Sequence, residues 1–300
     1  MKSGIINIYK EKGFTSFDVV AKLRGILHIK KIGHTGTLDP QASGVLPICI
    51  GKATKVSSML LDTDKSYDVT MLLGRSTDTY DIWGKTIEER EVSCTPQEVQ
   101  DVIDTFVGEI EQVPPMYSAI KVNGKKLYEL ARAGKVIERK SRRITIYNEE
   151  THSIKLPRVK MSIDCSKGTY IRSLCNDIGE KLGCLGCMEE LTRTRAGIFK
   201  IEDALLLSEI EELTRNDRIE EAILPVDEIF SSYPKCNILD SFKKMSINGA
   251  KLPVENAVEG EINQNESDFY RLYLMDGTFL GLYRRDGSML VPEKMFYEDI

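Results

Sequence analysis

The segment 33–47 constrains the fold of this 300-residue chain more than any other part of it. Its sequence, GHTGTLDPQASGVLP, holds three glycines, two prolines and several small hydroxyl residues. This composition is typical of a long ordered loop rather than of a core helix or strand, and functional side chains concentrate on such loops. Asp39 precedes Pro40, which holds Asp39 in extended backbone and directs its carboxylate. From these properties alone, Asp39 is either a functional carboxylate or a turn or cap residue.

Helices and strands are mixed along the chain without a regular βαβ alternation. Apolar residues at helical spacing predict helices over about 16–28 and 96–107, each beginning at a capping box, and another over about 171–182. Ser208 with Glu211 predicts the start of a short helix. Runs with strand character lie at 5–9, 45–50, 67–73, 117–122, 143–148 and 159–165. This mixture favours an α+β fold over a doubly wound one.

A chain of this length exceeds the size at which one hydrophobic core usually stops growing, so two domains are expected. The stretch 229–237 has no helical pattern, and we place the boundary there. Beyond it, the alternating runs 269–274 and 279–283 are punctuated by Asp-Gly turns at 276 and 286. These runs indicate a small β-rich module.

Cysteine and histidine usage argues against a metal centre. Seven scattered cysteines, an odd number, do not form a disulfide framework in a chain of this size, so we expect reduced thiols. Cys184 and Cys187 form the one CxxC pair, and neither a second pair nor a suitably spaced histidine accompanies it. We interpret these two cysteines as small residues at a helix end. The N-terminus lacks a signal-peptide pattern, and no apolar run reaches membrane-spanning length, which predicts a cytoplasmic protein without a membrane segment.

Charge is strongly segregated although the net charge is −5. Residues 121–143 carry nine Lys or Arg against two Glu, a net charge of +7, whereas 202–228 carry ten acidic and two basic residues, a net charge of −8. Affinity for a polyanion depends on the local field rather than on overall charge, so the pattern permits RNA binding. Charge runs are also common on solvated helix faces.

Several blocks of the chain closely resemble the signature segments of TruB-type pseudouridine synthases, and they follow one another in the same order as in that family. Besides the 33–47 loop, they are KSYDV (65–69), LGRSTDTYD (73–81), PPMYSAIK (114–121), SKGTYIR (166–172) and LTRTRAGIF (191–199). The last block departs from the family pattern, which often has Ala-His before it and Leu-Arg-Arg within it. Gly186-Cys187 and Leu191-Thr192-Arg193 stand there in this chain.

This resemblance implies a pseudouridine synthase fold of the α+β class. Its central sheet would be mixed and mainly antiparallel, with helices on its flanks. Residues 1–232 would form the catalytic domain, with a mobile thumb insertion at about 121–143 that closes on the RNA. Residues 233–300 would form a small β-rich, PUA-like RNA-binding domain.

The resemblance also implies an activity, namely isomerisation of the T-loop uridine (position 55) of tRNA to pseudouridine. Asp39 would be the catalytic carboxylate, either attacking the sugar carbon or assisting loss of the base. Arg172 would be the cation paired with Asp39. Tyr67 would stack on the flipped uracil and lie near C2′ as a proton acceptor or relay. The reaction breaks N1–C1′ and forms C5–C1′, which requires neither metal nor cofactor.

Further site residues follow from the same blocks. Tyr170 and Leu191 would complete the apolar walls, Asp81 would read the flipped-out nucleotides, and His34 would lie under a displaced base or phosphate. Basic residues of the thumb would contact RNA phosphates; those expected to do so are Lys121, Arg142 and Arg143.

Two other functions are compatible with the sequence. One is a guide-RNA-dependent pseudouridine synthase, which shares the signature loop. The other is a non-catalytic tRNA-binding or tRNA-folding protein, against which the presence of Asp39, Tyr67 and Arg172 together argues. The stand-alone enzyme is favoured by the thumb and the short C-terminal module, and its expected partner is the T-arm stem-loop of tRNA, bound by a monomer.

Overall fold

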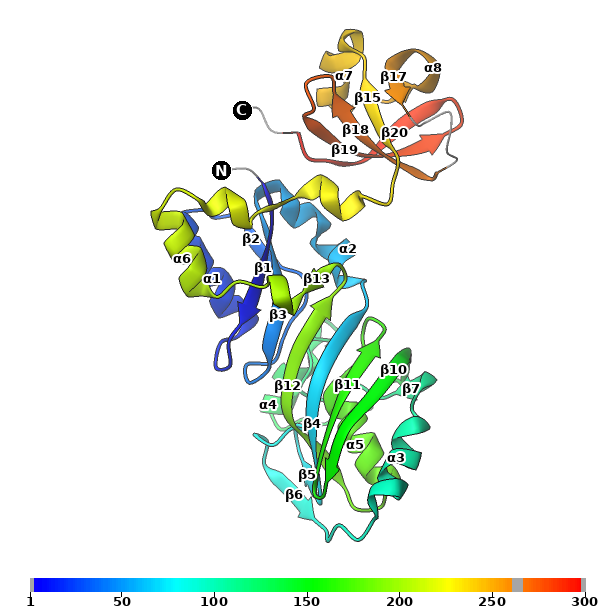
Figure 1. Cartoon of the computed structure of the whole chain (residues 1–300). Helices are drawn as coiled ribbons and strands as arrows, with labels where there is room; N and C mark the ends of the chain where they lie inside the picture. The colour runs from blue at the N-terminus through cyan, green and yellow to red at the C-terminus, as the bar shows by residue number, and fades with distance from the viewer. Residues whose placement is uncertain (1–2, 261–266, 298–300) are drawn as a thin grey trace.

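The computed structural model of the chain describes residues 3–260 and 267–297. It contains a large mixed sheet with helices beside it and a smaller β-rich module formed by the C-terminal residues (Figure 1). The α+β fold with a mainly antiparallel central sheet, expected from the sequence, is confirmed. Within the described residues, no helix is long and apolar enough to cross a membrane.

The large sheet has ten strands in the order β14-β1-β3-β12-β4-β11-β10-β7, with β2 added on β3 and β13 on β12. Its strands are β1 (Gly4–Lys10), β2 (Ile32–His34), β3 (Ser43–Ile50), β4 (Lys65–Leu73), β7 (Gly108–Gln112), β10 (Arg142–Lys155), β11 (Arg158–Cys165), β12 (Gly186–Ala196), β13 (Phe199–Lys200) and β14 (Leu224–Pro225). β12 pairs with β3 in parallel and with β4 antiparallel. This central strand therefore joins the two halves of the sheet.

Helices lie in two groups along the sheet. α1 (Ser16–Leu27) and α6 (Leu207–Arg215) contact each other beside β1, whereas α3 (Pro96–Asp104) and α5 (Ile171–Lys181) lie beside β4, β11 and β10 (Figure 1). Shorter helices are α2 (Ser57–Leu61) and α4 (Leu127–Arg132), and short 3₁₀ helices lie at Gly51–Val56, Ile201–Asp203, Ile219–Ala222 and Val226–Phe230. The main core consists of apolar side chains from this sheet and from α1, α3, α5 and α6.

The predicted capping boxes of α1 and α3 are confirmed. Thr15 accepts from the backbone N–H of Asp18, and Asp18 accepts from the backbone N–H of Thr15; Thr95 and Glu98 repeat the arrangement. α3 ends at Asp104, earlier than predicted. The predicted start of α6 at Ser208 is wrong, because the backbone N–H of Leu206 donates to the Glu209 carboxylate and the helix begins at Leu207.

The predicted strand over 117–122 is wrong for most of its length. Only β8 (Lys121–Val122) is extended there, in a two-residue ladder with β9 (Lys125–Lys126). The carbonyl of Ser118 accepts from Tyr128 N, and the carbonyl of Tyr117 accepts from Arg172. These carbonyls therefore bind α4 and a buried side chain instead of a neighbouring strand.

The interpretation of Cys184 and Cys187 as helix-end residues is correct only for the first. Cys184 follows α5, whereas Cys187 is the second residue of β12, which the sequence reading missed. All seven cysteines are free thiols, as expected.

The C-terminal module is a six-stranded sheet in the order β16-β20-β19-β18-β15-β17. Its elements are β15 (Lys235–Ile238), a 3₁₀ turn at Asp240–Phe242, α7 (Lys243–Ile247), β16 (Leu252–Pro253), α8 (Val254–Ala257), β17 (Val258–Gly260), β18 (Phe269–Leu274), β19 (Phe279–Asp286) and β20 (Met289–Met295). The two predicted runs and their Asp-Gly turns are confirmed, since β18, β19 and β20 are joined at these turns.

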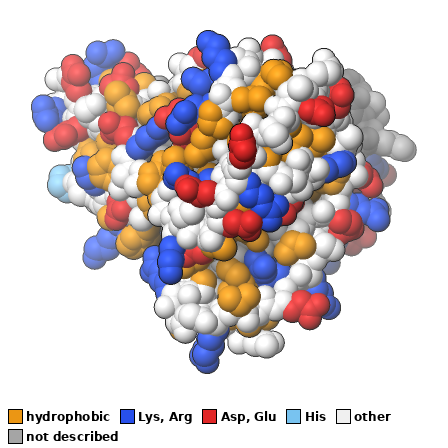
Figure 2. All heavy atoms as spheres, turned by 90° about the horizontal axis from the view of Figure 1, so that it is seen from below, with side chains coloured by type: hydrophobic (Ala, Val, Ile, Leu, Met, Phe, Trp, Pro, Cys, Tyr) orange, Lys and Arg blue, Asp and Glu red, His pale blue; other side chains and the backbone are white. Residues whose placement is uncertain are grey.

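An aromatic cluster joins this module to the large sheet. The ring of Phe230 lies 6.4 Å from that of Phe279 and 6.0 Å from that of Phe296, centroid to centroid. The same cluster includes Ile5 and Val45 from β1 and β3. The opposite end of the molecule, seen in Figure 2, carries basic, acidic and apolar side chains close together rather than a face of one sign.

Candidate active site

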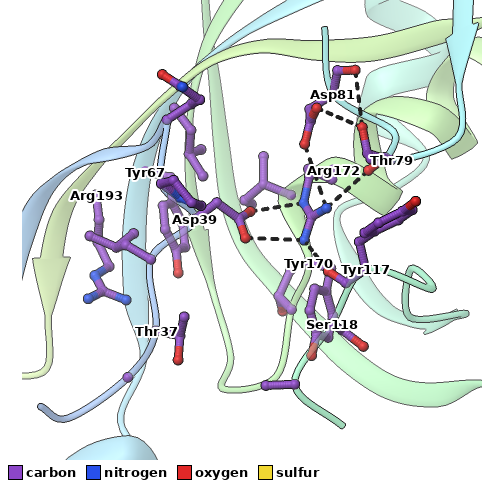
Figure 3. Close-up of a pocket in the computed structure, with 18 of the residues that line it drawn as sticks. Thr37, Asp39, Tyr67, Thr79, Asp81, Tyr117, Ser118, Tyr170, Arg172 and Arg193 are labelled. Atoms are coloured by element: carbon purple, nitrogen blue, oxygen red, sulfur yellow. Dashed lines mark hydrogen bonds and ion pairs between the residues drawn. The ribbon is translucent and has the colours of Figure 1, made fainter. Parts of the chain in front are cut away.

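A pocket of about 680 Å³ lies between the 33–47 loop, β4, β12, the first turn of α5 and α4 (Figure 3). This volume falls in the range of about 300–1,000 Å³ that encloses ligands of moderate size. The residues that line it are 36–41, Leu61, Lys65, Tyr67, Thr79, Asp81, Trp83, 117–119, Tyr128, Arg132, Ser166, 168–172, Leu191 and Arg193.

The 33–47 loop is ordered by contacts at both of its ends. Thr35 donates from its backbone and from its hydroxyl to the carbonyl of Pro47, at 3.1 and 3.2 Å. Gly44 has a φ of +103°, and a Cβ built there would lie 2.2 Å from the carbonyl oxygen of Arg193. Only glycine fits this position, because β12 approaches the loop backbone so closely.

The side chain of Lys10 connects the 33–47 loop to the segment that precedes α1. Its side chain is fully buried, and its Nζ donates to the carbonyls of Glu11 (3.1 Å), Phe14 (2.7 Å) and Pro40 (3.1 Å). Burial lowers the pKa of the Lys10 ammonium to about 8, against the opposing attraction of Asp39. The residue next to Asp39 is therefore held by a buried cation that the sequence reading did not identify.

Asp39 faces Arg172 across the pocket (Figure 3). Nε of Arg172 lies 2.9 Å from Oδ2 of Asp39, and Nη2 lies 3.3 Å from Oδ1. The Arg172 side chain is 6% exposed, while that of Asp39 is 36% exposed. The carboxylate is thus held by two charge-assisted contacts and still reaches the open pocket.

Arg172 is held on its other sides as well. It donates from Nη1 to the carbonyl of Thr79 (3.1 Å) and from Nη2 to the carbonyl of Tyr117 (2.8 Å), and Nη1 lies 3.6 Å from Oδ2 of Asp81. Burial raises the pKa of Asp81, against hydrogen bonding from Thr79 and the charge of Arg172. One guanidinium therefore separates two carboxylates of the pocket.

Tyr67 lies on β4, opposite Arg193 of β12. Burial raises the pKa of the Tyr67 hydroxyl, against the nearby charge of Arg193. Arg193 is itself buried, donates from Nε to the carbonyl of Val45 (2.7 Å), and has a buried Nη2 without a hydrogen bond in the described part of the chain. A second buried cation, which the sequence reading did not assign to the site, thus lies beside Tyr67.

Tyr170 and Leu191 provide apolar surface to the pocket. The backbone of Tyr170 exchanges two hydrogen bonds with the side chain of Gln112, at 2.8 and 3.0 Å, which fixes the entry into α5. Burial raises the pKa of the Tyr170 hydroxyl. Leu191 is buried on β12.

The pocket brings together most of the residues that the sequence singled out. Those that line it are Asp39, Tyr67, Asp81, Tyr170, Leu191 and Arg172. His34 ends β2, where it pairs with Ile48, and does not line the pocket; burial lowers its pKa.

The three basic residues expected to contact RNA lie apart from the pocket lining. Lys121 is exposed on β8. Arg142 and Arg143 begin β10 and pair with β7, so they belong to the large sheet although the thumb was expected to extend to 143. Tyr128 and Arg132 of α4 line the pocket instead; the sequence placed Arg132 only within the basic segment 121–143 and did not single out Tyr128.

Among the described residues, no group of three or more His, Cys, Asp or Glu side chains is arranged to hold a metal ion. The polar groups that line the pocket include a carboxylate held by a guanidinium, a second carboxylate, further basic side chains and four tyrosines. Such a set suits acid, base or nucleophilic chemistry on a bound organic group.

Comparison with known proteins places this geometry in a family. A model described as TruB family pseudouridylate synthase (N terminal domain) matches residues 24–171, and one described as tRNA pseudouridylate synthase B C-terminal domain matches residues 172–231. The chain is 50% identical to tRNA pseudouridine synthase B of Lachnoclostridium phytofermentans, over 98% of the chain and 99% of that protein. It is 47% identical to the protein of the same name from Clostridium novyi, with the same coverage.

Solved structures agree with this assignment. The chain resembles a protein in a crystal structure of a Cbf5-Nop10-Gar1 complex, with a TM-score of 0.73, 30% identity, and coverage of 98% of this chain and 85% of that one. A similar match, with a TM-score of 0.71 and 28% identity, is to the structure of an H/ACA RNP bound to a substrate RNA containing 2′-deoxyuridine.

Proposed function

Because this chain belongs to the TruB family of pseudouridylate synthases, it is an isomerase that forms pseudouridine in tRNA, and we propose that Asp39 is its catalytic carboxylate and the T-loop uridine (position 55) its target. The observation that carries this proposal is the two-point contact between Arg172 and Asp39, both of which line the pocket. It holds the carboxylate in one orientation while leaving it open to a ligand.

The reaction must break the N1–C1′ bond, turn the uracil over and join C5 to C1′. Asp39 acts either by attacking C1′ or by supporting departure of the base and the later loss of a proton. Both routes use a carboxylate anion, and the guanidinium of Arg172 lies beside Asp39 as its counter-charge. Tyr67 stacks on the uracil, and its hydroxyl accepts or relays a proton near C2′.

A uridine stacked within a folded loop cannot reach Asp39, so the nucleotide is extruded into the pocket. Tyr170 and Leu191 form its apolar walls. Asp81, on the far side of Arg172, reads the extruded nucleotides. His34, at the start of the 33–47 loop, supports a displaced base or phosphate outside the pocket.

The remaining parts of the chain serve RNA binding in this proposal. Residues 1–232 form the catalytic domain, in which 121–143 act as a thumb with Lys121, Arg142 and Arg143 on RNA phosphates. Residues 233–300 form a PUA-like domain that touches the acceptor end of tRNA. The enzyme acts as a monomer in the cytoplasm.

A guide-RNA-dependent synthase is the second candidate, because the matched structures include an H/ACA RNP with its substrate RNA. The short C-terminal module and the match over nearly the whole length to relatives named tRNA pseudouridine synthase B favour the first. A non-catalytic tRNA-binding protein is the third, and it has no need for the pairing of Asp39 with Arg172.

One experiment separates the three candidates. The purified protein alone is incubated with an unmodified T-arm stem-loop, and pseudouridine is quantified in the recovered RNA. Stoichiometric conversion supports the proposal. Conversion only after addition of a guide RNA supports the second candidate, and binding without conversion supports the third.

A further inference from the structure

Trp83, the one tryptophan of the chain, lines the pocket. It lies in the turn between β5 (Arg75–Thr77) and β6 (Thr86–Glu89), and 46% of its surface is exposed. Indole rings contribute large apolar area when they are covered, and an uncovered one beside a pocket marks a contact surface. A ligand that covers it would contact a rigid aromatic plane.

The turn that carries Trp83 is built on Asp81. The backbone N–H of Trp83 donates to Oδ1 of Asp81 at 3.2 Å, and the backbone N–H of Gly84 donates to the Asp81 carbonyl at 3.2 Å. Ile82 N donates to the Met188 carbonyl of β12 at 2.9 Å. The backbone of the turn that carries the indole is thereby held by the same carboxylate that faces Arg172, and it is joined to the large sheet through β12.

The backbone of Trp83 is bonded to Asp81, which contacts Arg172 through Nη1, whereas Asp39 contacts Nε and Nη2 of the same guanidinium. The guanidinium contacts Asp39 on one side and Asp81 on the other, as Figure 3 shows, and Trp83 follows Asp81 by two residues. Arg172 therefore lies between the carboxylate proposed to act on the target base and the carboxylate that holds the turn of Trp83.

The thumb contributes a second aromatic ring to the same pocket. Tyr128 of α4 lines it, with Nζ of Lys126 5.3 Å and Cζ of Arg132 5.5 Å from its ring centroid. An aromatic plane with cations close to it suits a base together with its phosphate. The pocket thus offers aromatic surface and positive charge in addition to Asp39 and Arg172.

We propose that Trp83 stacks on the base of a nucleotide next to the target uridine and so positions the loop for extrusion. The inference rests on the proposed function, in that the ligand is an RNA loop with one extruded nucleotide. Extrusion removes the stacking partner of the neighbouring base, and the indole replaces it. Trp83 is a positioning residue here, since it does not touch the reacting atoms.

Fluorescence tests the proposal directly, because emission at the tryptophan wavelength reports Trp83 alone. The wild-type protein is titrated with a T-arm stem-loop, with the same RNA abasic at the target, and with RNAs abasic at each flanking nucleotide. We expect quenching with the first two RNAs and its loss with one flanking abasic RNA. Quenching that disappears only when the target base is missing would overturn the proposal, and so would no quenching at saturation.

Variants give a second readout. Trp83→Ala is expected to weaken binding of the stem-loop by about 5- to 150-fold, the change that corresponds to about 1–3 kcal/mol for one stacked base. Trp83→Phe keeps a ring and should remain within a few-fold of wild type. Ile87→Ala is the matched control, because Ile87 lies on β6 of the same hairpin, is 66% exposed and does not line the pocket.

Measurement of the chemical step distinguishes a failure of this inference from a failure of the proposed function. At saturating RNA, the single-turnover rate of Trp83→Ala should stay within a few-fold of wild type. A wild-type protein that is quenched but forms no pseudouridine would refute the proposed function and leave the stacking role intact. An active wild-type protein whose Trp83→Ala variant binds RNA as well as Ile87→Ala does would refute the stacking role alone.

Discussion

Arg172 contacts both carboxylate oxygens of Asp39, with Nε 2.9 Å from Oδ2 and Nη2 3.3 Å from Oδ1. The same nitrogen Nη2 also donates to the carbonyl of Tyr117, so the guanidinium joins the 33–47 loop to the segment before the thumb. A planar group with several fixed donors is needed for this arrangement.

Replacement of Arg172 by Lys is therefore expected to impair the reaction although the charge is kept. An ammonium cannot make two contacts with Asp39 and also satisfy the carbonyls of Thr79 and Tyr117. The carboxylate should shift, and a misplacement of about 1 Å costs about 10²-fold in rate. The single-turnover rate at saturating tRNA is the measurement. A rate within threefold of wild type would show that charge alone suffices.

Tyr67 allows stacking and proton transfer to be separated. Tyr67→Ala removes the ring and should weaken binding of the extruded base by about 1–3 kcal/mol. Tyr67→Phe keeps the ring, so it should bind normally and turn over slowly if the hydroxyl takes part in the chemistry. Filter-binding titrations and single-turnover rates on the same preparations distinguish the two effects. Wild-type behaviour of both variants would exclude Tyr67 from the site.

Arg142 and Arg143 are expected to act through charge. Both are exposed on β10, and Arg143 lies 3.6 Å from Glu109. Replacement of both by Ala should weaken tRNA binding and leave the chemical step on bound RNA nearly unchanged. Each lost phosphate contact should lower the slope of log affinity against log salt by about 0.7–0.9. If the slope does not change, neither residue lies on the RNA-binding face.

We expect the carboxyl of Asp177 on α5 to make the stability of the fold depend on pH. Burial raises the pKa of its carboxyl to about 6 from an ordinary value of 3.8. Between these two values the folded state binds more protons than the unfolded state, so the free energy of unfolding falls as pH rises through the window. Asp177→Asn should flatten this dependence and raise Tm at pH 7. Thermal unfolding at pH 4, 5, 6 and 7 measures both, and an unchanged pH profile would contradict the assignment.

The sequence predicted most reliably what is encoded locally. The capping boxes at Thr15 and Thr95 act within one helical turn, and both are present in the structure. Gly44 and Pro40 likewise mark the 33–47 loop, because glycine and proline restrict the backbone wherever they occur. The resemblance to a known family added Tyr67 and Arg172, whose roles no local pattern reveals.

Other features depend on contacts between distant segments and could not be read from the sequence. The sequence did not predict β12, because charged residues interrupt the alternation of apolar and polar residues that is typical of a strand. The pairing of β12 with β3 and β4 is seen only in the structure. Nothing in the sequence distinguishes Lys10 from a surface lysine. Its ammonium is buried because it donates to the carbonyls of Phe14 and Pro40 in the folded chain. Arg193 is similar, since its burial beside Tyr67 arises only when β12 enters the sheet between two other strands.

The central claim of this account is that the Asp39 carboxylate carries the chemistry. Asn is nearly isosteric with Asp, so Asp39→Asn should preserve the loop, which is held by Lys10, Thr35 and Gly44 rather than by the carboxylate. An amide is a poor nucleophile and cannot neutralise Arg172. Loss of activity should therefore be nearly complete, and removal of a catalytic nucleophile can lower a rate on the order of 10⁶-fold.

The direct test is single-turnover release of tritium from uracil-labelled tRNA by Asp39→Asn, with a filter-binding titration on the same preparation. The account predicts no measurable release together with a tRNA affinity within a few-fold of wild type, because binding is spread over many phosphate and stacking contacts. Release at a rate within tenfold of wild type would contradict the assignment of Asp39 and most of the mechanism built on it.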